Sequence, residues 1–166
     1  MIPYRLFLEI ASQKLILMDF RIAELTDIKQ MQVVRHLVKE NMLSNPDLVT
    51  DKDVAEYITM RGRGWVCETD GKVTGFAIVD LQNKSVWALF VDPEHAERGA
   101  GKELHRLMLN WYFKQTKDNI VLGTSPGTRA ERFYAFQGWK NIGSYSNGEI
   151  KFELSYHDWI GNGFNR

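Results

Sequence analysis

The segment from Val86 to Lys102 constrains the fold of this chain more than any other part of its sequence. Its first part, Val86–Val91, is apolar at every position, which is typical of a central strand covered on both faces. Pro93 ends that strand, and two alternating glycines, Gly99 and Gly101, precede apolar residues at helical spacing. The sequence therefore predicts a buried strand, a short loop and a glycine-rich helix start.

A helix start of this kind can hold an anion. Its first backbone N–H groups have no partner within the helix, the helix dipole favours negative charge there, and glycines let a phosphate approach the main chain. The residues alone leave two interpretations open. Either the loop binds phosphate, or its small residues only allow the helix to pack closely on the strand.

The rest of the chain predicts a single α/β domain. Strand-like segments lie around Phe20 and Ile22 and at Trp65–Glu68, Lys72–Asp80, Val86–Val91, Ile120–Leu122, Ile142–Tyr145 and Ile150–Tyr156. Helices are expected after Thr26-Asp27, after the capping box at Thr50–Asp53, from about Gly99, and after a second capping box at Thr128–Glu131. The order lacks strict βαβ alternation and the dinucleotide fingerprint, which argues against a Rossmann fold.

Composition and length narrow the class of protein further. The 166 residues suit one domain with a sizeable core, and Lys plus Arg equals Asp plus Glu at 21 each, so we expect no nucleic-acid partner. No apolar run approaches the ~18 residues of a membrane span, so no membrane association is expected. Cys67 is the only cysteine, no zinc-ligand spacing is present, and we expect a cytoplasmic protein without a metal.

The N-terminal segment reads as separate from the domain. Residues 1–17 are rich in apolar side chains, but Glu9 and Lys14 interrupt the run and no small-residue cleavage site follows, so the segment is not a convincing signal peptide. We expect 1–17 to be an extension and 18–166 to form one domain.

A second segment, Arg129–Trp139, adds a short capped helix that places Tyr134 beside Phe133. Alone, such a pair indicates core packing more often than catalysis. Together with the first segment, however, it resembles the Gcn5-related N-acetyltransferase (GNAT) superfamily, in which a strand ending V-x-P leads into Q/R-x-x-G-x-G/A and a later helix reads A-x-x-F-Y-x-x-x-G-F/W. The matching residues are Val91, Pro93, Gly99, Gly101, Ala130, Phe133, Tyr134, Gly138 and Trp139.

The resemblance covers residues 18–166 and implies a fold. It is a GNAT-like α/β fold with a mixed, mostly antiparallel sheet of six to seven strands, flanked by about four helices. The fourth and fifth strands, here Val86–Val91 and Ile120–Leu122, would splay apart.

The resemblance also implies a co-substrate, acetyl-CoA. The free strand edge near Phe90 and Val91 would pair with the pantetheine arm. Arg129 lies close enough in sequence to reach the phosphates, and a solvent-exposed surface position suits it equally well. Tyr134 would also contact the co-substrate and act as a general acid that protonates the departing CoA thiolate, a role that suits a neutral phenol. The backbone amides expected to hold the pyrophosphate are those of Arg98, Gly99, Ala100, Gly101 and Lys102.

One position departs from the family pattern. Ala96 stands where the family has Gln or Arg, so a side-chain contact to the pyrophosphate is lost and Arg98 or Lys102 is left to supply the charge. Trp87 and the loop 123–128 are expected near the acetyl group.

No general base can be assigned from the sequence. Glu68 and Asp80 are candidates, although each is more typical of an ordinary strand residue. We expect His105 at the edge of the core and His95 in solvent.

The sequence thus leads to a principal hypothesis and two rivals. The principal one is transfer of the acetyl group of acetyl-CoA to a primary amine of a small molecule or peptide, by direct attack in a ternary complex. The rivals are a non-catalytic CoA-binding sensor or interaction module on the same fold, and an unrelated α/β domain whose glycine loop is structural. The acceptor is unidentified, and a homodimer through the final hairpin is compatible with the sequence.

Overall fold

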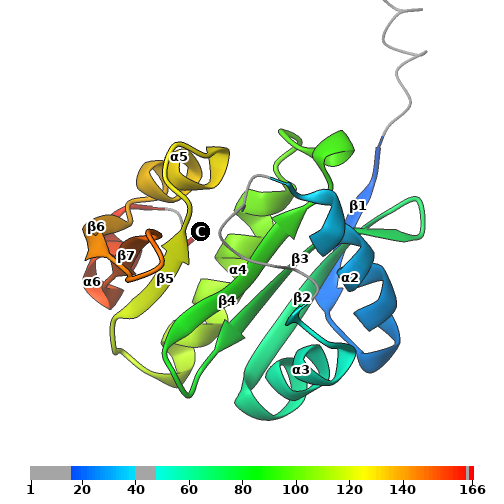
Figure 1. The fold of residues 1–166 in the computed structure, drawn as a ribbon, viewed down its shortest axis with the longest axis horizontal. Helices are drawn as coiled ribbons and strands as arrows, with labels where there is room; N and C mark the ends of the chain where they lie inside the picture. The colour runs from blue at the N-terminus through cyan, green and yellow to red at the C-terminus, as the bar shows by residue number, and fades with distance from the viewer. Residues whose placement is uncertain (1–15, 40–47, 164) are drawn as a thin grey trace, which may run out of the picture.

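A seven-stranded sheet forms the middle of the molecule in the computed structural model, which describes residues 16–39, 48–163 and 165–166 (Figure 1). Its strand order is β1-β2-β3-β4-β5-β7-β6, and all neighbours are antiparallel except β4 and β5. The strands are β1 (Met18–Ile22), β2 (Gly62–Thr69), β3 (Lys72–Asp80), β4 (Ser85–Val91), β5 (Ile120–Thr124), β6 (Lys140–Ser144) and β7 (Ile150–Leu154). The predicted mixed, mostly antiparallel sheet is confirmed. Most of the expected N-terminal extension, residues 1–15, lies outside the described part.

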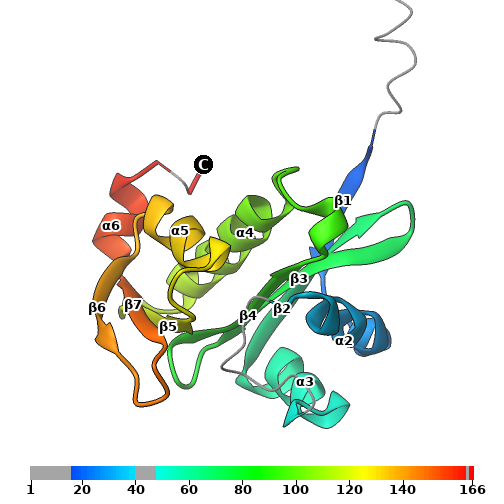
Figure 2. The ribbon, with the colours of Figure 1, turned by 45° about the horizontal axis from the view of Figure 1, so that its top comes forward.

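Helices cover both faces of this sheet (Figure 2). One face carries α2 (Ile28–Leu37) and α3 (Asp51–Glu56), and the other carries α4 (Ala100–Gln115) and α5 (Arg129–Phe136). Each face has its own apolar core, one built around α2 and α3 and one around α4. The remaining elements are the short turns η1 (Leu25–Asp27), η3 (Tyr57–Arg61) and η4 (Pro93–His95), and the helix α6 (Tyr156–Gly161).

Several local signals fold as predicted. Asp70 and Gly71 have φ of 51° and 77°, the conformation of a two-residue hairpin turn. Thr50 and Asp53 form the reciprocal capping box of α3. Thr128 caps α5 by accepting a hydrogen bond from the Glu131 N–H at 3.2 Å, which is one half of the predicted second capping box; the Glu131 carboxylate accepts from the Gly127 N–H instead of completing it. These signals succeed because each depends only on residues a few positions apart.

Several boundaries and caps differ from the prediction, among them the following three. The second strand begins at Gly62 rather than Trp65, because Gly62 pairs with Asp80 and leaves no room for a Cβ against the Val79 carbonyl. The Asp27 carboxylate accepts hydrogen bonds from Arg21 and from the Glu24 N–H instead of capping α2. The last strand ends at Leu154, after which Ser155 caps the unpredicted helix α6.

The parallel pair β4 and β5 meets at one end only. Their register contains the single pair Ser85↔Val121, supported by a hydrogen bond from the Val121 N–H to the Lys84 carbonyl at 3.0 Å. Beyond this point the strands diverge, as Figure 1 shows, and the predicted splay is confirmed. Within β4 the register with β3 also shifts, so Trp87 is an extra residue between Val86 and Ala88.

His105, expected at the edge of the core, lies at its centre and makes stability depend on pH. It is 1% exposed, and its Nε2 accepts a hydrogen bond from Trp139 Nε1 at 2.9 Å. Burial lowers the pKa of His105 to about 3, below the value of about 6.5 for an unfolded chain. Between these pKa values the unfolded state binds more protons than the folded state. The free energy of unfolding therefore decreases as the pH is lowered, by up to about 1.4 kcal/mol per pH unit.

We therefore expect the urea concentration at the unfolding midpoint to decrease when the pH is lowered from 7 to 5. His105→Gln should be less stable at pH 7 and lose much of this pH dependence, because glutamine does not titrate. A variant that kept the full slope would assign the acid sensitivity to another group.

Candidate active site

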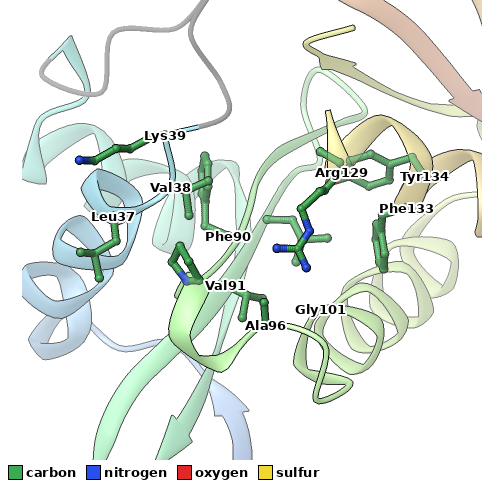
Figure 3. Close-up of a pocket in the computed structure, with 13 residues that line it drawn as sticks. Leu37, Val38, Lys39, Phe90, Val91, Ala96, Gly101, Arg129, Phe133 and Tyr134 are labelled. Atoms are coloured by element: carbon green, nitrogen blue, oxygen red, sulfur yellow. The ribbon is translucent and has the colours of Figure 1, made fainter. Parts of the chain in front are cut away.

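The divergence of β4 from β5 opens a cleft that contains two adjoining cavities. The larger, of about 560 Å³, lies between the end of α2, the end of β4, the start of α4 and α5 (Figure 3). The smaller, of about 110 Å³, lies between β4 and the end of β5. Both cavities are lined by Val38, Leu89, Phe90, Ala130 and Tyr134.

At one side of the larger cavity, the chain turns sharply into α4. Glu97 and Gly99 both have positive φ, of 64° and 89°, and Gly99 is the N-cap of the helix. The first main-chain bond of α4 runs from the Glu103 N–H to the Gly99 carbonyl at 3.1 Å. By helix geometry, the N–H groups that precede it have no partner within the helix itself, so this turn can bind an anion.

Gly101 serves a different purpose from Gly99. It lines the larger cavity, and a Cβ placed on it would make ordinary contacts, 3.7 Å from Val91 Cγ2 and 4.0 Å from Phe133 Cε2. The surrounding protein would therefore tolerate an alanine here. A larger side chain would enter the cavity, so the glycine keeps space in which a ligand can approach the helix start. This arrangement fits an elongated ligand that carries a phosphate group, such as acetyl-CoA.

The structure brings five of the predicted site residues to one cavity. Those lining the larger cavity are Phe90, Val91, Gly101, Arg129 and Tyr134. Ala100 is buried under the helix start, while Arg98 is exposed and lines none of the cavities described here. Gly99 and Lys102 line a third hollow of about 330 Å³, together with Glu103, Arg106, Gly163 and Arg166.

Arg129 reaches across the cleft from α5. Its Nη2 donates to Glu97 Oε1 at 2.8 Å, and Figure 3 shows the guanidinium extending between Phe133 and the turn at Ala96. Both partners are well exposed, so this ion pair contributes little to stability. It does place a positive charge beside Ala96, where the family pattern would have Gln or Arg.

Tyr134 lies at the junction of the two cavities. Its ring is held by aromatic neighbours, with centroids 5.3 Å from Phe133, 5.6 Å from Trp139 and 6.3 Å from Phe152. The residue is only 6% exposed, and burial raises the pKa of its phenol well above the ordinary value. The phenol therefore keeps its proton at neutral pH and can donate it.

The smaller cavity combines aromatic and hydroxyl groups. Trp87 lines it and stacks on Tyr57, with ring centroids 3.8 Å apart. The loop 123–128 lines it through Gly123, Thr124, Ser125 and Thr128. Among the described residues that line this cavity there is no carboxylate or imidazole.

The two base candidates lie elsewhere. Glu68 accepts a hydrogen bond from Arg21, and Asp80 is 1% exposed and accepts one from Arg61 at 2.6 Å. Asp80 Oδ1 also accepts the main-chain N–H groups of the following turn. Neither carboxylate lines either cavity, so both have structural partners instead of a place in the cleft.

The end of α2 is the part of the site that sequence reasoning missed. In the sequence, Leu37 and Val38 continue the helical spacing of Ile28, Met31 and Val34, which is typical of a stripe that packs inward. The helix ends at Leu37, and Val38 is extended, with φ −87° and ψ 107°, so these residues and Lys39 line the larger cavity. The hydrophobic pattern could not reveal this, because the same residues suit a core and a cavity wall.

Other chemistries lack support in the part of the chain that the structure describes. No group of three or more His, Cys, Asp or Glu side chains there could hold a metal ion. Cys67 is fully buried, and burial raises the pKa of its thiol, which disfavours the nucleophilic thiolate. Within the same residues, no helix has the length and hydrophobicity to cross a bilayer.

Comparison with known proteins places this site in context. The sequence model of the acetyltransferase (GNAT) family matches residues 31–139, which include both motifs. No curated protein sequence matches the chain.

Solved structures match the fold at low sequence identity. The ribosomal-protein-S18-alanine N-acetyltransferase of Escherichia coli superimposes with a TM-score of 0.67 at 18% identity, over 84% of this chain and 94% of that one. PaiA N-acetyltransferase of Thermoplasma acidophilum, solved with coenzyme A, gives 0.67 at 15%, over 84% and 99%. The spermidine/spermine N-acetyltransferase SpeG of Vibrio cholerae gives 0.63 at 14%, over 87% and 97%.

Proposed function

This chain belongs to the GNAT acetyltransferase family, and we propose that it transfers the acetyl group of acetyl-CoA to a primary amine of a small molecule or peptide, by direct attack in a ternary complex. The observation that carries the proposal is the position of Tyr134. It stands where a cavity leading to the α4 start meets a second cavity on the other side. One cavity suits the donor, the other suits the acceptor, and a proton donor lies between them.

The donor would occupy the larger cavity. The edge of β4 at Phe90 and Val91 faces the cleft and is free of β5, so it can pair with the amide groups of the pantetheine arm. The main-chain amides of residues 98–102 would hold the pyrophosphate. Arg129 would add positive charge beside Ala96, and Gly101 would leave the space that the ligand needs.

The chemistry requires few groups from the protein. The neutral amine nitrogen bonds to the acetyl carbonyl carbon, the carbon–sulfur bond breaks, and Tyr134 donates its proton to the departing sulfur. The proton of the amine passes to solvent, and Tyr134 is reprotonated from solvent. Most of the acceleration would come from holding the amine and the thioester in line, which is the largest contribution available to a site without a dedicated base.

The similar structures act on different amines. By their names, one acts on an alanine of ribosomal protein S18 and another on spermidine and spermine. Both peptide and small-molecule acceptors therefore occur on this fold, and at this level our proposal is limited to a primary amine.

A second function, that of a CoA-binding sensor or interaction module, is favoured by two observations. Ala96 lacks the side chain that the family pattern supplies, and no carboxylate or imidazole is found among the described residues lining the smaller cavity. Such a module would bind acetyl-CoA without turning it over.

Acetyl-CoA is expected to raise the melting temperature of the protein. A ligand present at about 100 times its dissociation constant stabilises the folded state by about 2.7 kcal/mol, which corresponds to roughly 5–10 °C for a domain of this size. Differential scanning fluorimetry with acetyl-CoA, and with acetyl phosphate as control, measures the shift. The absence of a shift at millimolar acetyl-CoA would contradict both functions, whereas release of thiol with an amine panel separates the enzyme from the sensor.

We also propose a compartment, a domain range and a partner for the enzyme. We place it in the cytoplasm, as one domain over residues 18–166, with an amine acceptor as its partner. A homodimer through the exposed strand β6 stays a prediction.

A further inference from the structure

A carboxylate from the β6–β7 hairpin lies against Gly123, one of the residues that line the smaller cavity. Gly123 lines that cavity, and Glu149 Oε2 lies so close to it that a Cβ built on Gly123 would overlap the carboxylate. Tyr145 Cε2 would lie 3.2 Å from the same Cβ. The lack of a side chain at position 123 is therefore what lets the Glu149 carboxylate approach the end of β5.

The hairpin holds the backbone of Glu149 firmly. The Tyr145 N–H donates to the Glu149 carbonyl at 2.8 Å, and the Glu149 N–H donates to Asn147 Oδ1 at 3.0 Å. The next residue, Ile150, is buried and pairs with Thr124 of β5. Because both sides of Glu149 are anchored, its half-buried side chain starts from a defined position.

This carboxylate lies on the face opposite the donor. Leu122 and Thr124 are buried on the α4 side of β5, so alternation along the strand places Gly123 and its partner Lys151 on the other face. Glu149, two residues before Lys151, shares that face. Figure 2 shows the hairpin tip extending away from α5, towards the side that carries α2 and α3. An acceptor arriving here would meet the thioester from the side opposite the α4 start.

Charge and size define what could bind. The described lining of the smaller cavity contains hydroxyl, aromatic and aliphatic groups, so Glu149 supplies a negative charge that the lining lacks. A cavity of about 110 Å³ has roughly the volume of four water molecules, which is enough for a slender group. A charged side chain on the same face, Lys151, has its Nζ 5.5 Å from the centroid of the Tyr145 ring.

Resting on the proposed function, we propose that Glu149 binds the ammonium group of the acceptor at the mouth of the smaller cavity, and that unhindered primary alkylamines are the substrate class. Charge-assisted hydrogen bonding to a half-buried carboxylate holds the amine beside the cleft. Proton loss to solvent then leaves the neutral nitrogen in place to attack.

Glu149→Gln tests the role of the charge while keeping the shape. With n-butylamine and 1,4-diaminobutane as probes, kcat/KM for the amine is expected to fall about 10- to 100-fold, mainly through KM, the range expected for losing a hydrogen bond to a charged group. The KM for acetyl-CoA and the shift in melting temperature with acetyl-CoA should stay as in the wild type. Added salt should raise the amine KM of the wild type but not of the variant.

Two further variants make the test specific. Glu153→Gln removes the same charge from the same face of the hairpin, but Glu153 pairs with Val121, which lines neither cavity, so its amine kinetics should match the wild type. Gly123→Ala should push the Glu149 carboxylate away from β5 and raise the amine KM as Glu149→Gln does. Its melting temperature with and without acetyl-CoA shows that the fold is retained.

The outcomes separate the inference from the proposed function. Unchanged amine kinetics in Glu149→Gln, or a preference for tert-butylamine or an alanine N-terminal peptide over n-butylamine, overturns the inference and leaves the acetyltransferase in place. If none of the amines tested causes thiol release, while acetyl-CoA still stabilises the wild type, the proposed function is overturned and the inference with it.

Discussion

Substituting leucine for Gly101 is expected to raise the dissociation constant of acetyl-CoA by at least about a hundredfold while leaving the fold intact. The leucine side chain would occupy the larger cavity between Val91 and Phe133, where the donor would lie. For acetyl-CoA to bind, either the leucine side chain or the ligand must move, which costs about 3 kcal/mol, the upper end of the range for overfilling a packed site. This free energy corresponds to about a hundredfold in affinity.

Loss of folding can be separated from loss of binding at this position. Gly101 is in the first turn of α4 without a positive φ, so leucine suits the helix better than glycine by up to about 1 kcal/mol. The variant should therefore unfold at the same urea concentration or a higher one. Gly101→Ala provides the graded control, because its Cβ makes only ordinary contacts and should weaken binding much less.

Isothermal titration with acetyl-CoA measures both affinities. If Gly101→Leu bound acetyl-CoA as tightly as the wild type, the donor could not lie in the larger cavity. The assignment of that cavity would then be wrong.

Replacing Tyr134 with phenylalanine is expected to lower the rate of thiol release about 10- to 1000-fold, because general acid catalysis contributes about 10²–10⁴. Burial raises the pKa of the phenol, so the wild-type residue stays protonated throughout the neutral range. Phenylalanine keeps the ring among Phe133, Trp139 and Phe152 and removes only the hydroxyl. Affinity for acetyl-CoA should change little.

Tyr112 offers a matched control for this variant. It is also fully buried, but its hydroxyl donates to the carbonyl groups of Asp118 and Asn119 and lines neither cavity. Tyr112→Phe should therefore lower stability slightly and leave the rate unchanged. Single-turnover measurements of thiol release compare the two variants, and equal rates for Tyr134→Phe and wild type would remove Tyr134 from the mechanism.

Together these variants distinguish an enzyme from a sensor. In an enzyme, Gly101→Leu removes binding and Tyr134→Phe removes turnover with binding kept. In a sensor, only the first effect exists, because there is no turnover to lose.

Much of the fold follows from local sequence signals. The limits of β3 match the prediction at both ends, Lys72 and Asp80, because the turn at Asp70-Gly71 sets one end and Asp80 side-chain bonds to the following turn set the other. The six-residue helix α6 escaped notice because such a short segment shows too little of the helical period. Its cap at Ser155 was the available signal.

The site was predictable only in part. Residues of the two motifs could be found because the two segments together resemble the GNAT motifs, which lie within short stretches of the chain. The wall formed by Val38 and the carboxylate of Glu149 could not, because each depends on how distant segments come together. Glu149 approaches Gly123 through the pairing of β7 with β5, about 25 residues away along the chain, a register set by buried partners such as Ile150 and Phe152.

The sequence by itself determined the strand from Val86 to Val91, the glycine-rich start of α4 and the helix that carries Tyr134, because turn conformation, capping and hydrophobic period act between neighbouring residues. Only the tertiary structure decided that β4 and β5 meet at Ser85 and Val121 and then part, that Tyr134 stands between two cavities, and that Glu149 lies against Gly123 in the lining of the second. These features arise from packing and strand pairing between residues far apart in the chain, which no local pattern specifies.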